Sequence, residues 1–169
     1  MIVPDNPELC SADNQSGLAT ISIRKKVNIF RRLYGIECAK QGSMATILLV
    51  DDDPLQASLM MSLLGSRFGN VCRVSDAAEA LCLIEQPEFA GKLDLVITGH
   101  HILGIGGPAF VAELRSRKPG LPVLVLAAKD AAPSEYSGAH VVFLPRPFGG
   151  DKMLAVTGQM LSDQTKAVA

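Results

Sequence analysis

The chain has 169 residues, 48% of them apolar, which is enough for one domain with a real core and excludes a chain disordered throughout. Its 16 basic and 17 acidic residues give a net charge of -1, whereas a dedicated nucleic-acid binder usually carries a basic excess. The longest apolar run, residues 121–128, is far shorter than the roughly 18 residues of a membrane span, so we expect none. The four cysteines form no Cys-x-x-Cys pair, which fits reduced thiols in the cytoplasm.

The first 43 residues differ in composition from the rest of the chain. Residues 23–40 carry six basic residues and one acid, whereas residues 44–169 carry ten basic and thirteen acidic residues. One interpretation is a surface-binding helix with four larger side chains on one side, Val27, Phe30, Leu33 and Tyr34. We favour the other interpretation, in which residues 1–43 are a disordered extension or untranslated upstream sequence, and Met44 is the true start. The predicted domain then spans residues 44–165.

The first half of this domain alternates strand and helix. Residues 47–50 are an apolar run typical of a buried strand. A helix then begins at Pro54, ends at Gly65 to Gly69, and carries an apolar stripe expected to face the core, made of Leu55, Leu59, Leu63 and Phe68. Residues 71–74 predict a second strand. Ser75 or Asp76 caps the next helix, whose inner face holds Ala77, Leu81 and Ile84.

The second half continues the same alternation. Strands are predicted at residues 93–98, 123–127 and 141–144. A helix over residues 108–118 turns Phe110, Val111 and Leu114 inward. The last helix starts at Asp151 and buries Met153, Val156, Met160 and Leu161. Five alternations of strand and helix predict an α/β domain with a parallel sheet covered by helices on both faces.

Ligands of such sheets bind beyond the carboxyl ends of the strands. Four short segments stand at those ends, namely Asp51-Asp52-Asp53, Gly99-His100-His101, Ala127-Ala128 and Pro145-Arg146-Pro147. Any chemistry of this chain is therefore expected there. We expect Asp53 to cap the helix that begins at Pro54, and the adjacent histidines of the second segment to be exposed.

Four motifs in order point to a family: ILLVDDDP, DLVIT followed by a Gly-rich loop, PVLVLAA, and FLPRPF. Together they resemble the receiver domain of bacterial response regulators, over about residues 45–163. The resemblance implies a flavodoxin-like (βα)5 doubly wound sheet. It also implies a site in which two acids and a third-strand aspartate hold magnesium, and in which that aspartate accepts a phosphoryl group. A Thr or Ser after the fourth strand and a Lys before a cis proline then bind the phosphate.

Part of that apparatus is present. Asp51 and Asp52 match the acid pair, and Phe143 falls where the family often has its fifth-strand switch aromatic. Gly107 matches the turn glycine after the third strand, and Pro147 matches the proline after the lysine position.

The three phosphoryl-handling positions depart from the family pattern. Gly99 stands at the phosphoacceptor position, Ala127 at the Thr or Ser position, and Arg146 at the Lys position. Gly99 has no side chain, so the resemblance gives no catalytic residue and the chain is predicted not to be an enzyme. We expect Arg146 to replace the metal by pairing with Asp52, and we expect no cofactor beyond a weak magnesium site at Asp51 and Asp52.

These departures predict a pseudo-receiver of two-component or phosphorelay signalling that works without phosphorylation. Few residues follow the last helix, so we expect it to stand alone. It would bind a histidine kinase, phosphotransfer protein or effector through the family's fourth helix, fifth strand and fifth helix. That fourth helix is expected to be short or irregular, because only 11 residues separate Ala127 from Gly138.

Two alternatives stay open. A phosphoryl group could be accepted by Asp51, Asp52 or a nearby histidine. The pocket vacated at Gly99 and Ala127 could instead sense a small anion, held by Arg146. An independent hydrolase has no nucleophile–base pair that the sequence places together.

Overall fold

The computed structural model of the chain describes residues 44–127, 131–136 and 138–167. The predicted extension, residues 1–43, lies outside the described residues, and the domain boundary at Met44 stays a prediction. In the part of the chain that is described, no helix combines the length and the apolar character that a membrane span requires.

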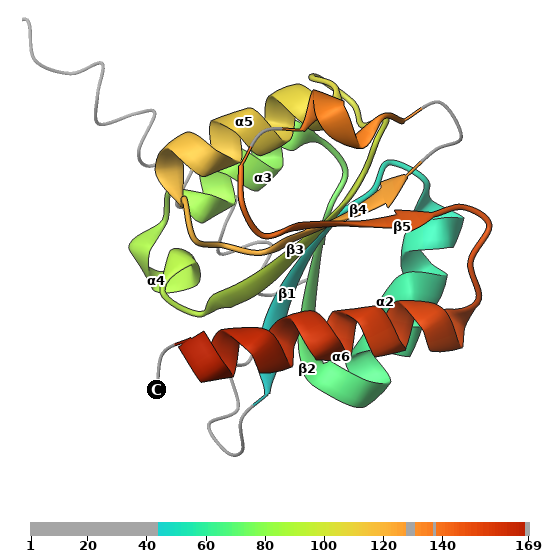
Figure 1. Cartoon of the computed structure of the whole chain (residues 1–169). Helices are drawn as coiled ribbons and strands as arrows, with labels where there is room; N and C mark the ends of the chain where they lie inside the picture. Colours follow the sequence, from blue (N-terminus) through green and yellow to red (C-terminus); the bar gives the residue numbers. More distant parts are fainter. Residues whose placement is uncertain (1–43, 128–130, 137, 168–169) are drawn as a thin grey trace, which may run out of the picture. The chain divides into compact units, whose positions relative to one another are not determined.

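The centre of the domain is one sheet of five parallel strands in the order β2-β1-β3-β4-β5 (Figure 1). The strands are β1 Ala45–Val50, β2 Gly69–Val74, β3 Leu93–Gly99, β4 Val123–Ala127 and β5 Val141–Pro145. Each coincides with a predicted apolar run or extends it by a few residues. The predicted doubly wound, flavodoxin-like fold is therefore confirmed.

Helices cover both faces of the sheet. On one face lie α2 (Pro54–Phe68) and α6 (Gly150–Ala167), and on the other lie α3 (Ala77–Ile84) and α5 (Gly107–Arg117) (Figure 1). The short helix α4 (Pro87–Ala90) follows α3 in the chain, and the loop after β3 leads into α5. Asp53 caps α2 as predicted, because its carboxylate accepts hydrogen bonds from the N–H groups of Leu55 and Gln56. Asp76, one of the two predicted caps, performs the same role for α3.

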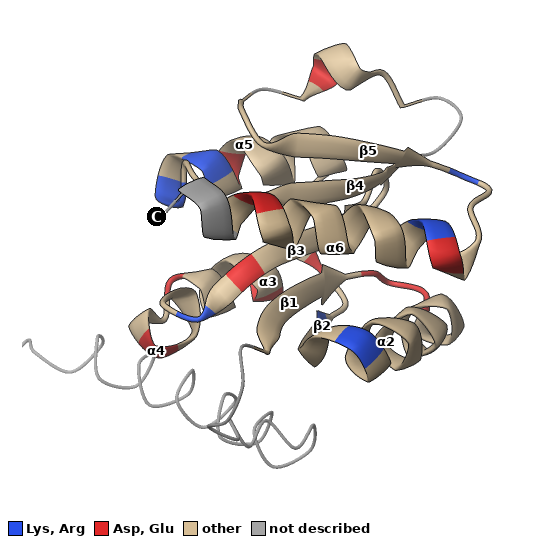
Figure 2. Ribbon diagram, turned by 60° about the horizontal axis from the view of Figure 1, so that its bottom comes forward, with Lys and Arg blue, Asp and Glu red and all other residues tan. Residues whose placement is uncertain are grey.

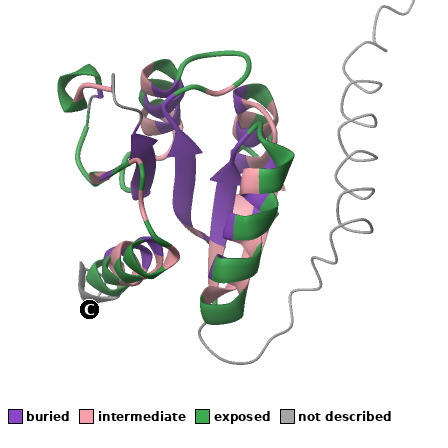
Figure 3. Ribbon diagram, turned by 90° about the vertical axis from the view of Figure 1, so that its right-hand side faces the viewer, coloured by how far each residue is buried: buried purple, intermediate pink, exposed green. Residues whose placement is uncertain are grey.

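The core follows from the alternation of side chains along the strands. Ile47 and Leu49 of β1 and Leu95 and Ile97 of β3 are fully buried and belong to the cluster that packs against α2 and α6. Figure 3 shows the strands coloured as buried between helices whose outer sides are exposed. The inward residues predicted for α5, Phe110, Val111 and Leu114, are all buried.

The prediction for the inner face of α2 is wrong. Leu55, Leu59 and Leu63 are 78%, 69% and 39% exposed. The buried residues of α2 are Ala57, Met60 and Leu64. At about 100° per residue the centre of this set lies about 130° around the helix from the centre of the leucine stripe, so the two sets cannot both face the sheet. Of the predicted stripe, Phe68 alone packs against the core.

The prediction of a short helix between β4 and β5 is confirmed in the described residues. A 3-10 turn of three residues, η1 (Pro133–Glu135), stands where the family has a helix. The next residue, Tyr136, is buried. Among the described residues of this connection, a three-residue turn therefore stands directly before a buried aromatic side chain.

Candidate functional site

The sequence-predicted site residues lie at the carboxyl end of the sheet. Val50 of β1 pairs with Thr98 of β3, so the next residues, Asp51 and Gly99, lie side by side at the ends of these strands. Gly99 in turn pairs with Leu126, the residue before Ala127 on β4. The N–H group of Arg146 donates to the carbonyl of Ala127, at 3.0 Å. We call this region the cleft.

Asp51 is the buried acid of the cleft. Its side chain is 5% exposed, and one carboxylate oxygen accepts a hydrogen bond from the N–H group of Asp53, at 2.9 Å. The other, Oδ2, is buried without a hydrogen-bond partner among the described residues. Burial raises the pKa of Asp51 above 3.8, against the hydrogen bond from Asp53 and the charge of Arg146, which both lower it. Asp52, in contrast, is exposed.

The predicted ion pair between Arg146 and Asp52 is wrong, because the acid nearest to Arg146 is Asp51. Nη2 of Arg146 lies 3.9 Å from Oδ2 of Asp51, too far for a hydrogen bond. Asp51 and Asp52 follow β1 directly, and Asp51 is buried whereas Asp52 is exposed, so only Asp51 lies within reach of Arg146. The guanidinium carbon also lies 5.9 Å from the centre of the Phe148 ring. Arg146 directly follows β5, and a cis peptide bond joins it to Pro147, as the resemblance implies.

A second arginine beside Asp51 was missed by the sequence analysis. Nε and Nη2 of Arg73, on β2, donate to the main-chain carbonyl of Asp51 at 3.2 and 3.0 Å. The available signal was one charged residue inside an otherwise apolar strand, next to its carboxyl end. Two guanidinium groups therefore flank the single buried acid of the cleft.

The phosphoacceptor position offers less free space than a missing side chain implies. A Cβ atom at Gly99 would lie 3.1 Å from the carbonyl oxygen of His101 and 3.6 Å from Cγ2 of Ile102. The loop after β3 thus lies close to the strand end. Ala127, at the end of β4, is 6% exposed and supplies no hydroxyl group.

Next to this position lies a buried His–Tyr pair. Nδ1 of His100 is 2.7 Å from the hydroxyl oxygen of Tyr136, and the two residues are 9% and 8% exposed. The expectation that both histidines are exposed is therefore wrong for His100 and confirmed for His101. Burial, with a smaller effect of the charge on Glu135, raises the pKa of Tyr136 to about 12, so its hydroxyl keeps its proton at neutral pH.

The same tyrosine contacts the predicted switch aromatic. The rings of Tyr136 and Phe143 meet edge to face, with centroids 5.1 Å apart and planes at 76°. Gly107 makes the space for this arrangement, since a Cβ there would lie 2.7 Å from both the Tyr136 hydroxyl and the His100 carbonyl. We call His100, Gly107, Tyr136 and Phe143 the aromatic lock. The sequence analysis treated Gly107 only as a turn glycine and overlooked Tyr136, one of two tyrosines in the chain.

The comparisons with known proteins agree with this geometry. The family model described as "Response regulator receiver domain" matches residues 47–156. Over 97 residues the chain is 31% identical to the "Probable transcriptional regulatory protein TcrX" of Mycobacterium tuberculosis, a match covering 57% of this chain and 40% of that protein. Over 123 residues it is 30% identical to the "Sensor kinase CckA" of Brucella abortus, covering 71% of this chain and 13% of that protein. The chain thus matches less than half of the length of each.

Among solved structures, a response regulator receiver domain protein from Clostridium thermocellum superposes with a TM-score of 0.66 at 21% identity, covering 75% of this chain and 100% of that one. The receiver domain of the hybrid histidine kinase CckA superposes with a TM-score of 0.57 at 28% identity, covering 69% of this chain and 99% of that one. The chain belongs to the family of response regulator receiver domains.

The family implies a magnesium ion at the cleft, and the described residues do not fit one. Magnesium prefers several carboxylate and other hard oxygen ligands. Asp51 is the single buried carboxylate here, its open oxygen faces Arg146, and Asp52 is exposed. Across residues 44–127, 131–136 and 138–167, no group of three or more His, Cys, Asp or Glu side chains could share an ion. The metal role of Asp51 and Asp52 therefore remains a prediction.

Proposed function

We propose that this receiver domain is a pseudo-receiver, which transmits its signal by binding another protein and not by accepting a phosphoryl group. The observation that carries the proposal is Gly99 at the end of β3, where the family's acceptor aspartate stands. Glycine offers no atom that could attack phosphorus, and phosphoryl transfer needs a positioned nucleophile. Ala127 supplies no hydroxyl group for a phosphate oxygen.

The surroundings of Gly99 support the proposal. In the family a lysine at the position of Arg146 supplies the positive charge that binds a transferred phosphoryl group. Here the guanidinium group of Arg146 lies 3.9 Å from the carboxylate of Asp51. Arg146 already lies beside that carboxylate and Arg73 binds the main-chain carbonyl of the same residue, so an incoming metal ion would meet like charges there.

The aromatic lock supports a fixed signalling state. A conventional receiver uses its ligand to shift a two-state equilibrium. Here Phe143 packs edge-on against Tyr136, and Tyr136 is held by His100. Both contacts are made by side chains of the chain itself, so on this proposal the domain presents one conformation to its partner.

The proposed partner is a histidine kinase, a phosphotransfer protein or an effector, as is usual for receiver domains. We place its contact on η1, β5 and α6, the local equivalents of the family's fourth helix, fifth strand and fifth helix. In support, β5 is an edge strand, Val142 on it is 37% exposed, and the residues of η1 are exposed. On this proposal the domain is cytoplasmic, is not an enzyme and needs no cofactor. That it acts without an attached output domain remains a prediction, which the intact mass of the protein from its source cells would test.

Treatment with acetyl phosphate and magnesium, followed by intact mass, tests the proposal. The wild-type chain is expected to gain no phosphoryl group, while a receiver with an acceptor aspartate, treated in parallel, gains one. The variant Gly99→Asp is a sharper comparison, because it places a carboxylate at the end of β3. Its Cβ atom would lie 3.1 Å from the carbonyl oxygen of His101, so the loop has to shift slightly to accept the side chain. A phosphoryl adduct on the wild type at Asp51, Asp52 or a histidine would replace this proposal with the first alternative.

A sensor of small anions is the second candidate, favoured by the exposure of Arg146. Its side chain is 35% exposed and lines a groove together with Gln56. A thermal-shift series with phosphate, nucleotides and small carboxylates tests it, because a ligand that binds only the folded state raises the melting temperature. A rise that disappears in Arg146→Ala would support this candidate.

A further inference from the structure

The outer side of α2 is unusually apolar for a surface helix. Leu55, Leu59 and Leu63 follow one another at a spacing of four residues and remain 78%, 69% and 39% exposed. This spacing places them in one ridge along the helix. We call these three residues the leucine ridge. Contiguous exposed apolar surface of this kind marks an interaction site more often than single exposed leucines do.

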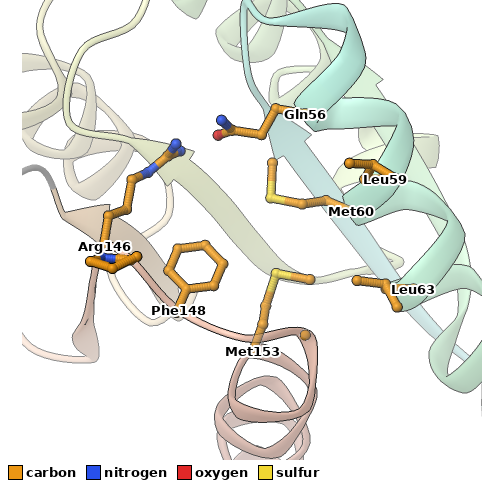
Figure 4. Close-up of a pocket in the computed structure, with 9 residues that line it drawn as sticks. Gln56, Leu59, Met60, Leu63, Arg146, Phe148 and Met153 are labelled. Atoms are coloured by element: carbon orange, nitrogen blue, oxygen red, sulfur yellow. The ribbon is translucent and has the colours of Figure 1, made fainter.

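A groove runs directly beside the leucine ridge. It has a volume of about 600 Å³, and Leu59 and Leu63 form part of its wall. Figure 4 shows Met60, Phe148 and Met153 lining it, with Arg146 and Gln56 at one end. Leu63 reaches the start of α6, since a Cβ atom at Gly150 would lie 3.1 Å from its Cδ1. One face thus carries both a ridge and a groove.

The helix that carries the ridge is almost without charge, and Arg146 lies at one end of the groove. The sequence of α2, PLQASLMMSLLGSRF, contains a single charged residue, Arg67, in its last turn. The remaining outward positions between the leucines hold serines, Ser58 and Ser62. Figure 2 shows α2 almost entirely in the colour of uncharged residues, whereas the segment after β1 is acidic.

The lack of charge selects among the partners that an apolar ridge could bind. In a contact around a two-fold axis the same patch meets itself, so any charge near the axis would face a like charge. A helix without charge at the axis avoids this repulsion. A ridge beside a groove also satisfies the need for self-complementarity, because the ridge of each copy can enter the groove of the other.

We propose that the leucine ridge and the adjoining groove bind a second copy of this chain, in a two-fold contact centred on α2 with Leu59 near the axis. The contact removes from water the leucines that the monomer leaves exposed. The contact is centred on α2, whereas the proposed partner surface also includes η1 and β5, and the two surfaces share the start of α6. The contact does not depend on the missing phosphoacceptor, so either proposal can fail without the other.

Sedimentation velocity on the full chain, over a wide concentration range, tests the proposal. The wild type is expected to move from a species of 17.9 kDa towards twice that mass as concentration rises. Leu59→Glu and Leu59→Lys should each raise the dissociation constant by about tenfold or more, because each places like charges at the axis. An equimolar mixture of the two variants should recover the dimer, because opposite charges then meet.

Leu103→Glu is the matched control, since Leu103 is a 58% exposed leucine in the loop after β3. It should dimerise as the wild type does, and circular dichroism should show all variants folded. A wild type that stays monomeric at every concentration would overturn the proposal, whether or not another protein covers the ridge. So would a dimer indifferent to Leu59→Glu. A mixture that fails to recover the dimer would overturn the two-fold arrangement.

Discussion

The two sides of the cleft differ in how far their side chains are buried and paired. Beside β4 and β5 the described residues form only the short turn η1, and the histidine and tyrosine of the aromatic lock are buried and hydrogen-bonded to each other. Beside β1 and α2 the secondary structure is complete, yet Asp51 keeps an oxygen without a partner among the described residues, and the leucine ridge remains in water. We call the side at β4 and β5 the closed side, because its polar side chains are paired within the domain. We call the side at β1 and α2 the open side, because its leucine ridge is exposed to solvent and can bind another molecule.

The largest effect is expected from opening the closed side. Tyr136→Ala removes a buried aromatic ring, its contact with Phe143 and the hydrogen bond to His100. We expect it to lower the free energy of unfolding by about 3 kcal/mol, measured by urea denaturation. Tyr136→Phe keeps the ring and should cost only about 1 kcal/mol. Equal losses in the two variants would mean that the ring itself contributes little, and that the side is not closed by packing.

A methyl group inside the aromatic lock should also be costly. Gly107→Ala places a Cβ atom 2.7 Å from the Tyr136 hydroxyl, which cannot stay beside His100 without a shift. We expect a loss of about 2 kcal/mol in the free energy of unfolding. Gly120→Ala is the control, because nothing lies within 4 Å of its added Cβ. If both glycine variants melt at the same temperature, the space at Gly107 is not limiting.

At the boundary between the two sides, Asp51→Asn should stabilise the protein by about 1 kcal/mol at neutral pH. Burial raises the pKa of Asp51 above 3.8, so the folded state holds this proton more tightly than the unfolded chain does. The contribution of Asp51 to stability is therefore full below pH 3.8 and is lost as the pH rises through the folded-state pKa.

The gain in Asp51→Asn should accordingly vanish at acid pH, as followed by urea denaturation across the pH range. A gain in Arg146→Ala would not be expected, because that variant leaves the carboxylate without its nearest cation. A variant Asp51→Asn that is less stable at neutral pH would show that the ion contact with Arg146 outweighs the burial of the charge.

The smallest effect is expected on the open side. Leu55→Ser should change the free energy of unfolding of the monomer by less than about 0.5 kcal/mol, because the leucine is 78% exposed. Leu64→Ser, one position of the inner face of α2 and fully buried, is the contrast and should be severely destabilised. A large loss in Leu55→Ser at low protein concentration would mean that the ridge is part of the monomer core.

The difference between the two sides also marks what the sequence could predict. Strands such as residues 93–98 were predictable because a continuous apolar run has one stable place in a parallel sheet, its centre. The inner face of α2 was not, because both Leu55-Leu59-Leu63 and Ala57-Met60-Leu64 have helical spacing. The choice between them depends on how closely the helix approaches the sheet, and a small alanine with a flexible methionine allows the closer approach.

The candidate site divides in the same way. The positions of Asp51, Gly99 and Ala127 followed from the ends of the apolar runs. The partner of Arg146 did not, since neighbouring acids at a strand end differ only in the direction of their side chains. Tyr136 lay in a segment without periodicity, and its contact with His100 spans 36 positions in the chain. Such long-range contacts leave no local pattern.

The most direct test of the central claim is the amide NMR spectrum of the full chain, titrated with magnesium and beryllium fluoride, which mimics a phosphoryl group on a carboxylate. The signals of Gly99, Ala127 and Phe143 are predicted to stay in place, because the cleft has no acceptor carboxylate at the end of β3 and Phe143 is already held by Tyr136. Saturable shifts at Gly99 and Ala127 that extend to Phe143 would contradict the claim.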